Sequence, residues 1–245
     1  MDRLQAIAWF NTVAHRFRDD SPFRLEKFFQ PENVRVNVDG KRVTTRAWDK
    51  YRDGDRLPRD GCKKDGQPGP VVAAGKVIPD SLYIFRHPIW QVMRANKLSF
   101  EETVRMLGFF EPFVSRYYLD LETRDPVRQF EAFAKNVGLP IWIDREDDPH
   151  KSLDHLAVHL MILRMDNFKY LTANFETIAE NIAKTLGPLS VSPWLGSIHE
   201  EFYDWLEANV WGDIFNRYYL HGSQSISGWR KSRHEWLVPS QDVEV

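Results

Sequence analysis

Apolar residues recur every three or four positions along most of the chain, with polar residues between them. This spacing gathers the apolar side chains on one face of a helix, and it is clearest over residues 3–17 and 167–186. Helix-starting residues precede several such stretches, at Ser21-Pro22, His87-Pro88 and Ser99. The pattern predicts a mainly α-helical, multi-helix globular protein.

One segment has the two-residue period of a β-strand instead. The three valines from Val34 to Val38 alternate with polar residues, and Asp39-Gly40 then forms a dipeptide typical of a tight hairpin turn. Val43 continues the apolar positions beyond the turn. We therefore expect at most one small β-hairpin, near residues 34–43.

A stretch rich in glycine and proline, residues 54–70, interrupts the helical pattern. Such a composition is typical of a long surface loop and marks the best candidate boundary in the chain. We expect an N-terminal helical module with a basic segment over residues 1–66 and an aromatic-rich helical domain over residues 70–245. One continuous domain is the alternative, since 245 residues suit either arrangement.

The overall composition indicates a cytoplasmic globular protein. Cys62 is the only cysteine, so no disulfide can form within the chain and a reducing compartment is expected. No stretch approaches the roughly 18–20 consecutive apolar residues of a membrane-spanning helix, and the first residues lack the apolar run of a signal peptide. We therefore expect no membrane partner.

Basic residues concentrate between residues 34 and 66. Ten Lys and Arg against six Asp give this interval a charge of +4, in a chain whose net charge is −2. A local excess of positive charge is typical of a phosphate-binding surface. A short helix is predicted from Thr45 to about Arg52, and its start can offer both side chains and free backbone N–H groups to nucleic acid. The candidate contacts here are Thr45, Arg46, Lys50, Arg52 and Arg56.

Residues 44–58 also resemble part of a known DNA-binding family. Tyr51 is followed by Gly54 three positions on and by Pro58 four positions beyond that. This spacing, after a Thr-containing helix, is similar to the end of the recognition helix in Cro/repressor-type helix-turn-helix proteins. Arg52 stands where that family usually has Glu, and the alternating valines occupy the place of its small-residue turn. The resemblance implies a DNA-contacting helix at residues 44–53.

Another interpretation of the same segment involves no ligand. Trp48 and Tyr51 are large enough to anchor a short helix to the core, and Gly54 suits its C-terminal cap. The charged residues between them would then form a solvated face.

A second basic segment lies near the C-terminus, where aromatic and basic residues mix between Trp229 and His234. Such a mixture suits contact with a single strand or a phosphate, and it equally suits a protein interface or a segment packed on the core. Its candidate nucleic-acid contacts are Arg230, Lys231 and Arg233.

Candidate metal ligands are His155 and His159, four residues apart on a predicted helix that follows Ser152. Both project from one helix face. Leucines form the opposite stripe, so we expect the histidine face to be exposed or lightly packed. No Glu follows the first histidine, so the metalloprotease motif is absent. The sequence also lacks a nucleophile elbow, a phosphate-binding glycine loop and a dinucleotide fingerprint, so no cofactor is expected.

These observations favour a non-enzymatic DNA-binding or regulatory protein that uses the basic helix at residues 44–53. A protein-interaction module is the alternative, such as an immunity or accessory factor that binds through an aromatic helical surface. An enzyme whose site leaves no local motif is the third possibility.

Overall fold

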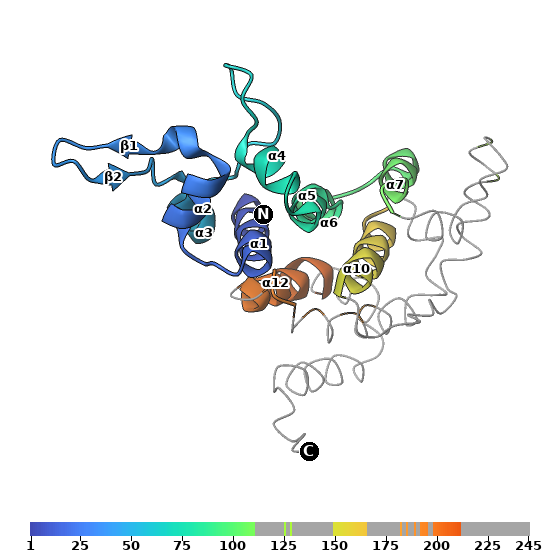
Figure 1. Cartoon of the computed structure of the whole chain (residues 1–245). Coiled ribbons are helices and arrows are strands. Elements are labelled where there is room, and N and C mark those ends of the chain that lie inside the picture. The colour runs from blue at the N-terminus through green and yellow to red at the C-terminus, as the bar shows by residue number, and fades with distance from the viewer. Residues whose placement is uncertain are drawn as a thin grey trace, which may run out of the picture. The chain divides into compact units, whose positions relative to one another are not determined.

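The computed structural model describes residues 1–110, 125, 128, 149–165, 182, 185, 189, 192–195 and 198–211. The protein is mainly helical with one small two-stranded antiparallel hairpin, as the sequence predicts (Figure 1). The chain divides into two compact units. The first comprises Met1–Trp90 and Ser192–Ile198, and the second comprises Gln91–Val191 and His199–Val245. The loop of residues 54–70 thus lies inside the first unit, with chain of that unit on both sides.

The first unit contains most of the described elements. Their order is α1 (Asp2–Phe17), α2 (Pro22–Phe29), a 3-10 turn η1 (Pro31–Asn33), β1 (Arg35–Val36), β2 (Arg42–Val43), α3 (Ala47–Asp53), α4 (Pro70–Gly75) and α5 (Pro79–Arg86). Local sequence signals set several of these boundaries. Proline at the first helical position begins α2, α4 and α5, because a missing N–H costs nothing there. Gly54, with φ of 76°, ends α3 as predicted.

Aromatic rings from several helices form the core of the first unit. Trp9 on α1 and Trp48 on α3 are fully buried, with ring centroids 5.1 Å apart. Phe29 on α2 stacks on Trp48 at 5.5 Å, and Tyr51 meets Trp9 edge-on at 5.8 Å. The indole N–H of Trp48 donates to the Oε1 of Gln30 over 3.1 Å. Trp48 and Tyr51 are therefore core anchors, and the face of α3 that carries them is unavailable to a ligand.

The second unit is described over fewer residues. Helix α6 (Ile89–Arg94) leads into it from the first unit, and α7 (Phe100–Leu107), α10 (Pro149–Arg164), α12 (His199–Leu206) and a π-helical turn η4 (Glu207–Trp211) follow. Ser99 and Glu102 form the expected capping box of α7. The end of α10 is fixed by Leu98, whose N–H donates to the carbonyl of Arg164 over 2.8 Å. None of the helices in the described part of the chain combines the length and apolar character needed to cross a membrane.

Candidate nucleic-acid interface

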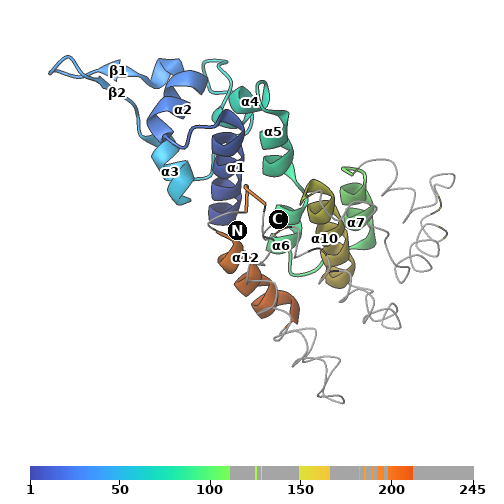
Figure 2. The same ribbon diagram turned by 60° about the horizontal axis from the view of Figure 1, so that its bottom comes forward.

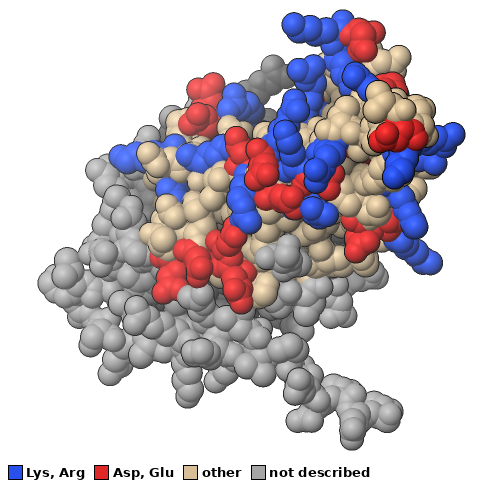
Figure 3. Space-filling view, turned by 90° about the vertical axis from the view of Figure 1, so that its left-hand side faces the viewer, with Lys and Arg blue, Asp and Glu red and all other residues tan. Residues whose placement is uncertain are grey.

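Formal charge differs sharply between the two units. The first contains 17 Lys and Arg against 12 Asp and Glu, a net charge of +5, whereas the second contains 16 against 23, a net charge of −7. Lys and Arg gather over the face of the first unit that carries the hairpin, with Asp and Glu lying among them (Figure 3). The near-neutral total therefore hides a basic unit, and the candidate interface lies on it.

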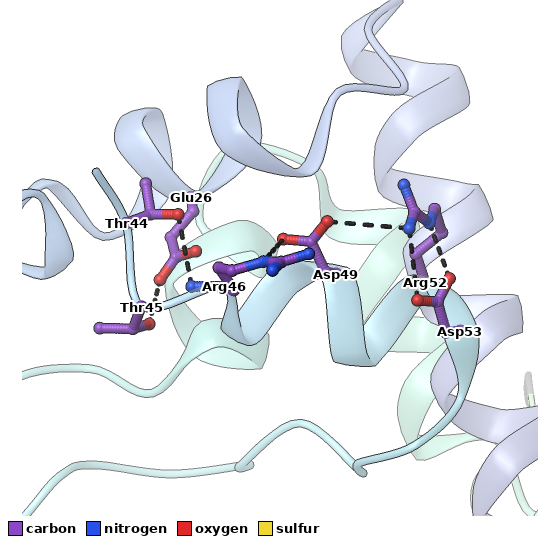
Figure 4. A network of polar contacts seen from close by, with 7 residues as sticks. All are labelled: Glu26, Thr44, Thr45, Arg46, Asp49, Arg52 and Asp53. Atoms are coloured by element: carbon purple, nitrogen blue, oxygen red, sulfur yellow. Dashed lines mark hydrogen bonds and ion pairs between the residues drawn. The ribbon is translucent and has the colours of Figure 1, made fainter. Parts of the chain in front are cut away.

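The outer face of α3 carries its charges in internal ion pairs. The carboxylate of Asp49 forms ion pairs with the guanidinium groups of Arg46 at 3.9 Å and Arg52 at 3.7 Å, each three residues away on the helix. Arg52 also donates two hydrogen bonds to Asp53, at 2.8 and 3.3 Å (Figure 4). These bonds lower the pKa of the Asp53 carboxyl. The charges of Arg46 and Arg52 are therefore largely compensated by their own helix.

The two threonines before α3 serve the fold. The hydroxyl of Thr45 donates to the carboxylate of Glu26 on α2 (Figure 4). The same carboxylate also accepts a hydrogen bond from the side-chain amide of Asn33 over 3.0 Å. Glu26 is fully buried, and its Oε2 atom has no hydrogen-bond partner among the described residues. Thr44 accepts a hydrogen bond from the N–H of Arg46 over 3.3 Å. Both hydroxyls are thus committed to holding the start of α3.

Lys50 and Arg56 differ from these residues. Both are exposed, and neither forms an ion pair within the part of the chain that is described. Arg56 lies beyond the C-terminal cap, where its N–H donates to the carbonyl of Lys50 over 3.3 Å. Burial raises the pKa of the nearby Tyr51 phenol, and the charge of Arg56 partly opposes that rise. Of the five residues predicted here, these two keep cations open to a ligand.

The hairpin carries a further set of exposed cations: Arg35, Lys41 and Arg42. It projects away from α1 and α2 in both ribbon views (Figures 1 and 2). The sequence pattern predicts the hairpin and its positive charge, but it indicates no role for these three residues. The signal that could have identified them was the presence of three basic residues within the predicted hairpin of residues 34–43.

An open pocket of about 740 Å³ lies where α1 ends and α2 begins. Its lining is mainly charged: Ala14, His15, Arg16, Arg18, Asp19, Asp20 and Arg24. Arg24 pairs with Asp19 at 3.3 Å, and Arg16 pairs with Asp80 of α5. The lining therefore combines three cations with two carboxylates, and two of the cations already have acidic partners.

The candidate metal ligands lie in the second unit, on α10. The expectation of an exposed or lightly packed histidine face is wrong, because His155 and His159 are 4% and 1% exposed. The Nδ1–H of His159 donates to the carbonyl of His155 over 2.6 Å. Burial lowers the pKa of His159 to about 4, so its ring is neutral. No cluster of three or more metal-binding side chains occurs among the described residues.

The remaining predicted contacts, Arg230, Lys231 and Arg233, lie outside the described residues.

The order of the elements differs from that of the helix-turn-helix family that residues 44–58 resemble. Here η1 and the hairpin separate α2 from α3, where that family has a short turn. The chain matches no protein-family model, no curated protein and no solved structure.

Proposed function

We propose that this protein is a non-enzymatic nucleic-acid-binding protein, regulatory in role, and that its first unit contacts the phosphate backbone. The observation that carries the proposal is the +5 charge of this unit against −7 for the second. Binding to the phosphate backbone is mainly electrostatic and needs clustered Lys and Arg. An acidic second unit repels nucleic acid, which would confine contact to the first unit.

Within the basic helix segment, we assign the phosphate contacts to Lys50 and Arg56. Both side chains are exposed, and within the described structure no carboxylate pairs with either. Arg46 and Arg52 are secondary contacts, because a phosphate must replace their aspartate partners. That replacement costs little, since exposed ion pairs contribute only about 0–1 kcal/mol. Thr45 is held by Glu26 and is assigned no contact.

Fluorescence anisotropy of a labelled DNA duplex of mixed sequence tests the assignment at low salt. The double variant Lys50→Ala/Arg56→Ala should bind more weakly than the wild type. The matched control is Lys76→Ala/Arg105→Ala, which removes the same charge from exposed positions elsewhere and should bind like the wild type. Absence of wild-type binding would refute the function, whereas equal weakening by both variants would refute the assigned residues.

A protein-interaction module is the second candidate, and exposed aromatic residues on α2 favour it. Phe28 is 54% exposed and Phe23 is 40% exposed, so one short helix presents two large apolar rings to solvent. Phe28 packs on Phe17 with ring centroids 4.7 Å apart, so its ring is held in place before any partner arrives. Aromatic side chains of this kind contribute strongly to protein interfaces. A stoichiometric complex that survives moderate salt and is lost in Phe28→Ser would favour this candidate over nucleic acid.

A further inference from the structure

The hairpin formed by β1 and β2 is a ribbon with two open faces. Val36 is 67% exposed, Val38 is fully exposed and Val43 is 40% exposed. A two-stranded ribbon is only marginally stable by itself and normally buries one face against the rest of the protein. Here Val36 and Val38 lie mostly open to solvent, and Val43 on the opposite face is partly covered. Both faces of the ribbon therefore keep exposed side chains that a partner can reach.

The strand register distributes charge over both faces. Arg35 pairs with Val43, and Val36 pairs with Arg42. Directly opposed residues of an antiparallel pair share a face, and neighbouring positions on a strand point to opposite faces. Each face of the ribbon consequently carries one arginine and one valine. A partner that lies against one face only would contact one arginine and one valine and leave the other pair in solvent.

The tip of the ribbon is held by one side chain. The Oδ1 atom of Asn37 accepts from the N–H of Asp39 over 3.1 Å and from the N–H of Lys41 over 2.8 Å. The Asn37 backbone adds a bond from its N–H to the carbonyl of Lys41 over 2.9 Å. Gly40 adopts a φ of 75°, which this turn needs. The tip is thus ordered although the ribbon lacks a packed face, and ordering before binding lowers the entropic cost of binding.

We propose that this hairpin enters the major groove of double-stranded DNA, an inference that rests on the proposed function. The major groove of B-form DNA admits a two-stranded ribbon, and phosphate backbones line both of its walls. Those two walls match arginines on both faces of the ribbon. Val38, fully exposed in the turn between the strands, can contact thymine methyl groups on the groove floor. In this arrangement Lys41, which follows the tip of the hairpin, lies beside the phosphate backbone of the DNA.

The same features argue against other nucleic acids. The major groove of an RNA duplex is deep and narrow, so a ribbon does not fit into it. Single strands are bound mainly by stacking bases on aromatic side chains, and the ribbon from Arg35 to Val43 contains no aromatic residue. Duplex DNA is therefore the partner that the charge and shape of the ribbon match best.

Dimethyl sulfate footprinting on a DNA duplex of mixed sequence tests the inference, because the reagent methylates guanine N7 in the major groove and adenine N3 in the minor groove. Saturating wild-type protein should protect guanine N7 and leave adenine N3 reactive. The variant Arg35→Ala/Arg42→Ala should lose the N7 protection and, at low salt, bind more weakly by roughly several-fold for each lost phosphate contact. Circular dichroism checks that this variant is folded.

The charge-matched comparison is Lys50→Ala/Arg56→Ala, which should still protect guanine N7 once enough protein is added to saturate the duplex. Wild-type protein that binds the duplex without N7 protection would overturn the inference and leave the proposed function standing. Protection that persists in the arginine variant would also overturn it, as would tighter binding to the single strand or to an RNA duplex. Wild-type protein that binds no nucleic acid would refute both this inference and the proposed function.

Discussion

Acidification should destabilise the second unit through one buried histidine. His159 is fully buried, and its Nδ1–H donates to a backbone carbonyl, so the proton of the charged form must go to Nε2. That atom is also buried and has no hydrogen-bond partner among the described residues. Burial therefore lowers the pKa of His159 from 6.5 to about 4. The unfolded chain binds this proton more readily than the folded chain does.

The size of the effect follows from the two pKa values. Between pH 6.5 and about pH 4 the unfolded state holds more protons at this position than the folded state. The contribution of neutral His159 to the free energy of unfolding is thus fully present above pH 6.5, and it falls as the pH drops through this window. At about 1.4 kcal/mol per pH unit, the loss by pH 4.5 amounts to about 2–3 kcal/mol.

Urea denaturation monitored by circular dichroism, from neutral pH down to pH 4.5, measures this loss. Other titrating groups contribute too, so the informative quantity is the difference between the wild type and His159→Leu. The variant, which cannot titrate at this position, should lose about 2–3 kcal/mol less than the wild type over the same range. Equal slopes for the two proteins would refute the reasoning, as would a His159 ring whose NMR titration midpoint lies near 6.5.

Three further substitutions test the first unit by urea denaturation. Trp48→Ala should cost about 3–5 kcal/mol, because the ring is fully buried among other aromatic residues; a loss below about 1 kcal/mol would exclude its role as core anchor. Gly54→Ala should cost more than about 1 kcal/mol, because φ is 76° and the new Cβ would lie 2.9 Å from the Cδ1 of Ile7; an unchanged midpoint would contradict this. Arg46→Ala/Arg52→Ala should change stability by about 1 kcal/mol or less, since these ion pairs are exposed; a larger loss would show that the pairs hold α3 in place.

Local signals made much of the fold predictable. The hairpin turn at Asp39-Gly40, the cap at Gly54 and the capping box at Ser99 each depend on residues within a few positions of one another. The valine alternation was visible for the same reason. Such features are set by backbone preferences that a short stretch of sequence carries by itself.

The candidate site was less predictable, because its properties depend on contacts between distant segments. The bond from Thr45 to Glu26 joins residues 19 positions apart, and no local pattern announces it. The prediction of an exposed or lightly packed histidine face failed because both faces of α10 are covered, whereas helical periodicity identifies only the more apolar face. The pairing of Arg46 with Asp49 was foreseeable, since the three-residue spacing is visible in the sequence.

The proposed contact with DNA is a basic surface and not a recognition helix. The short helix α3 gives its apolar face to the core and compensates much of its own charge, so it is a poor reader of DNA bases by itself. In the proposed function, the principal contacts are the hairpin and two cations that pair with no described carboxylate, Lys50 and Arg56. A regulatory protein built in this way would bind DNA chiefly through its backbone, with the ribbon supplying contact in the groove.

The salt dependence of DNA binding by the full chain tests the central claim most directly. Five exposed cations carry the proposed contact: Arg35, Lys41, Arg42, Lys50 and Arg56. If each neutralises one phosphate, a plot of log affinity against log salt should have a slope of about −4 to −5, which is a loss of several hundredfold between about 50 and 200 mM salt. A slope near zero, or no binding at the lower salt concentration, would contradict the claim that the basic unit binds nucleic acid.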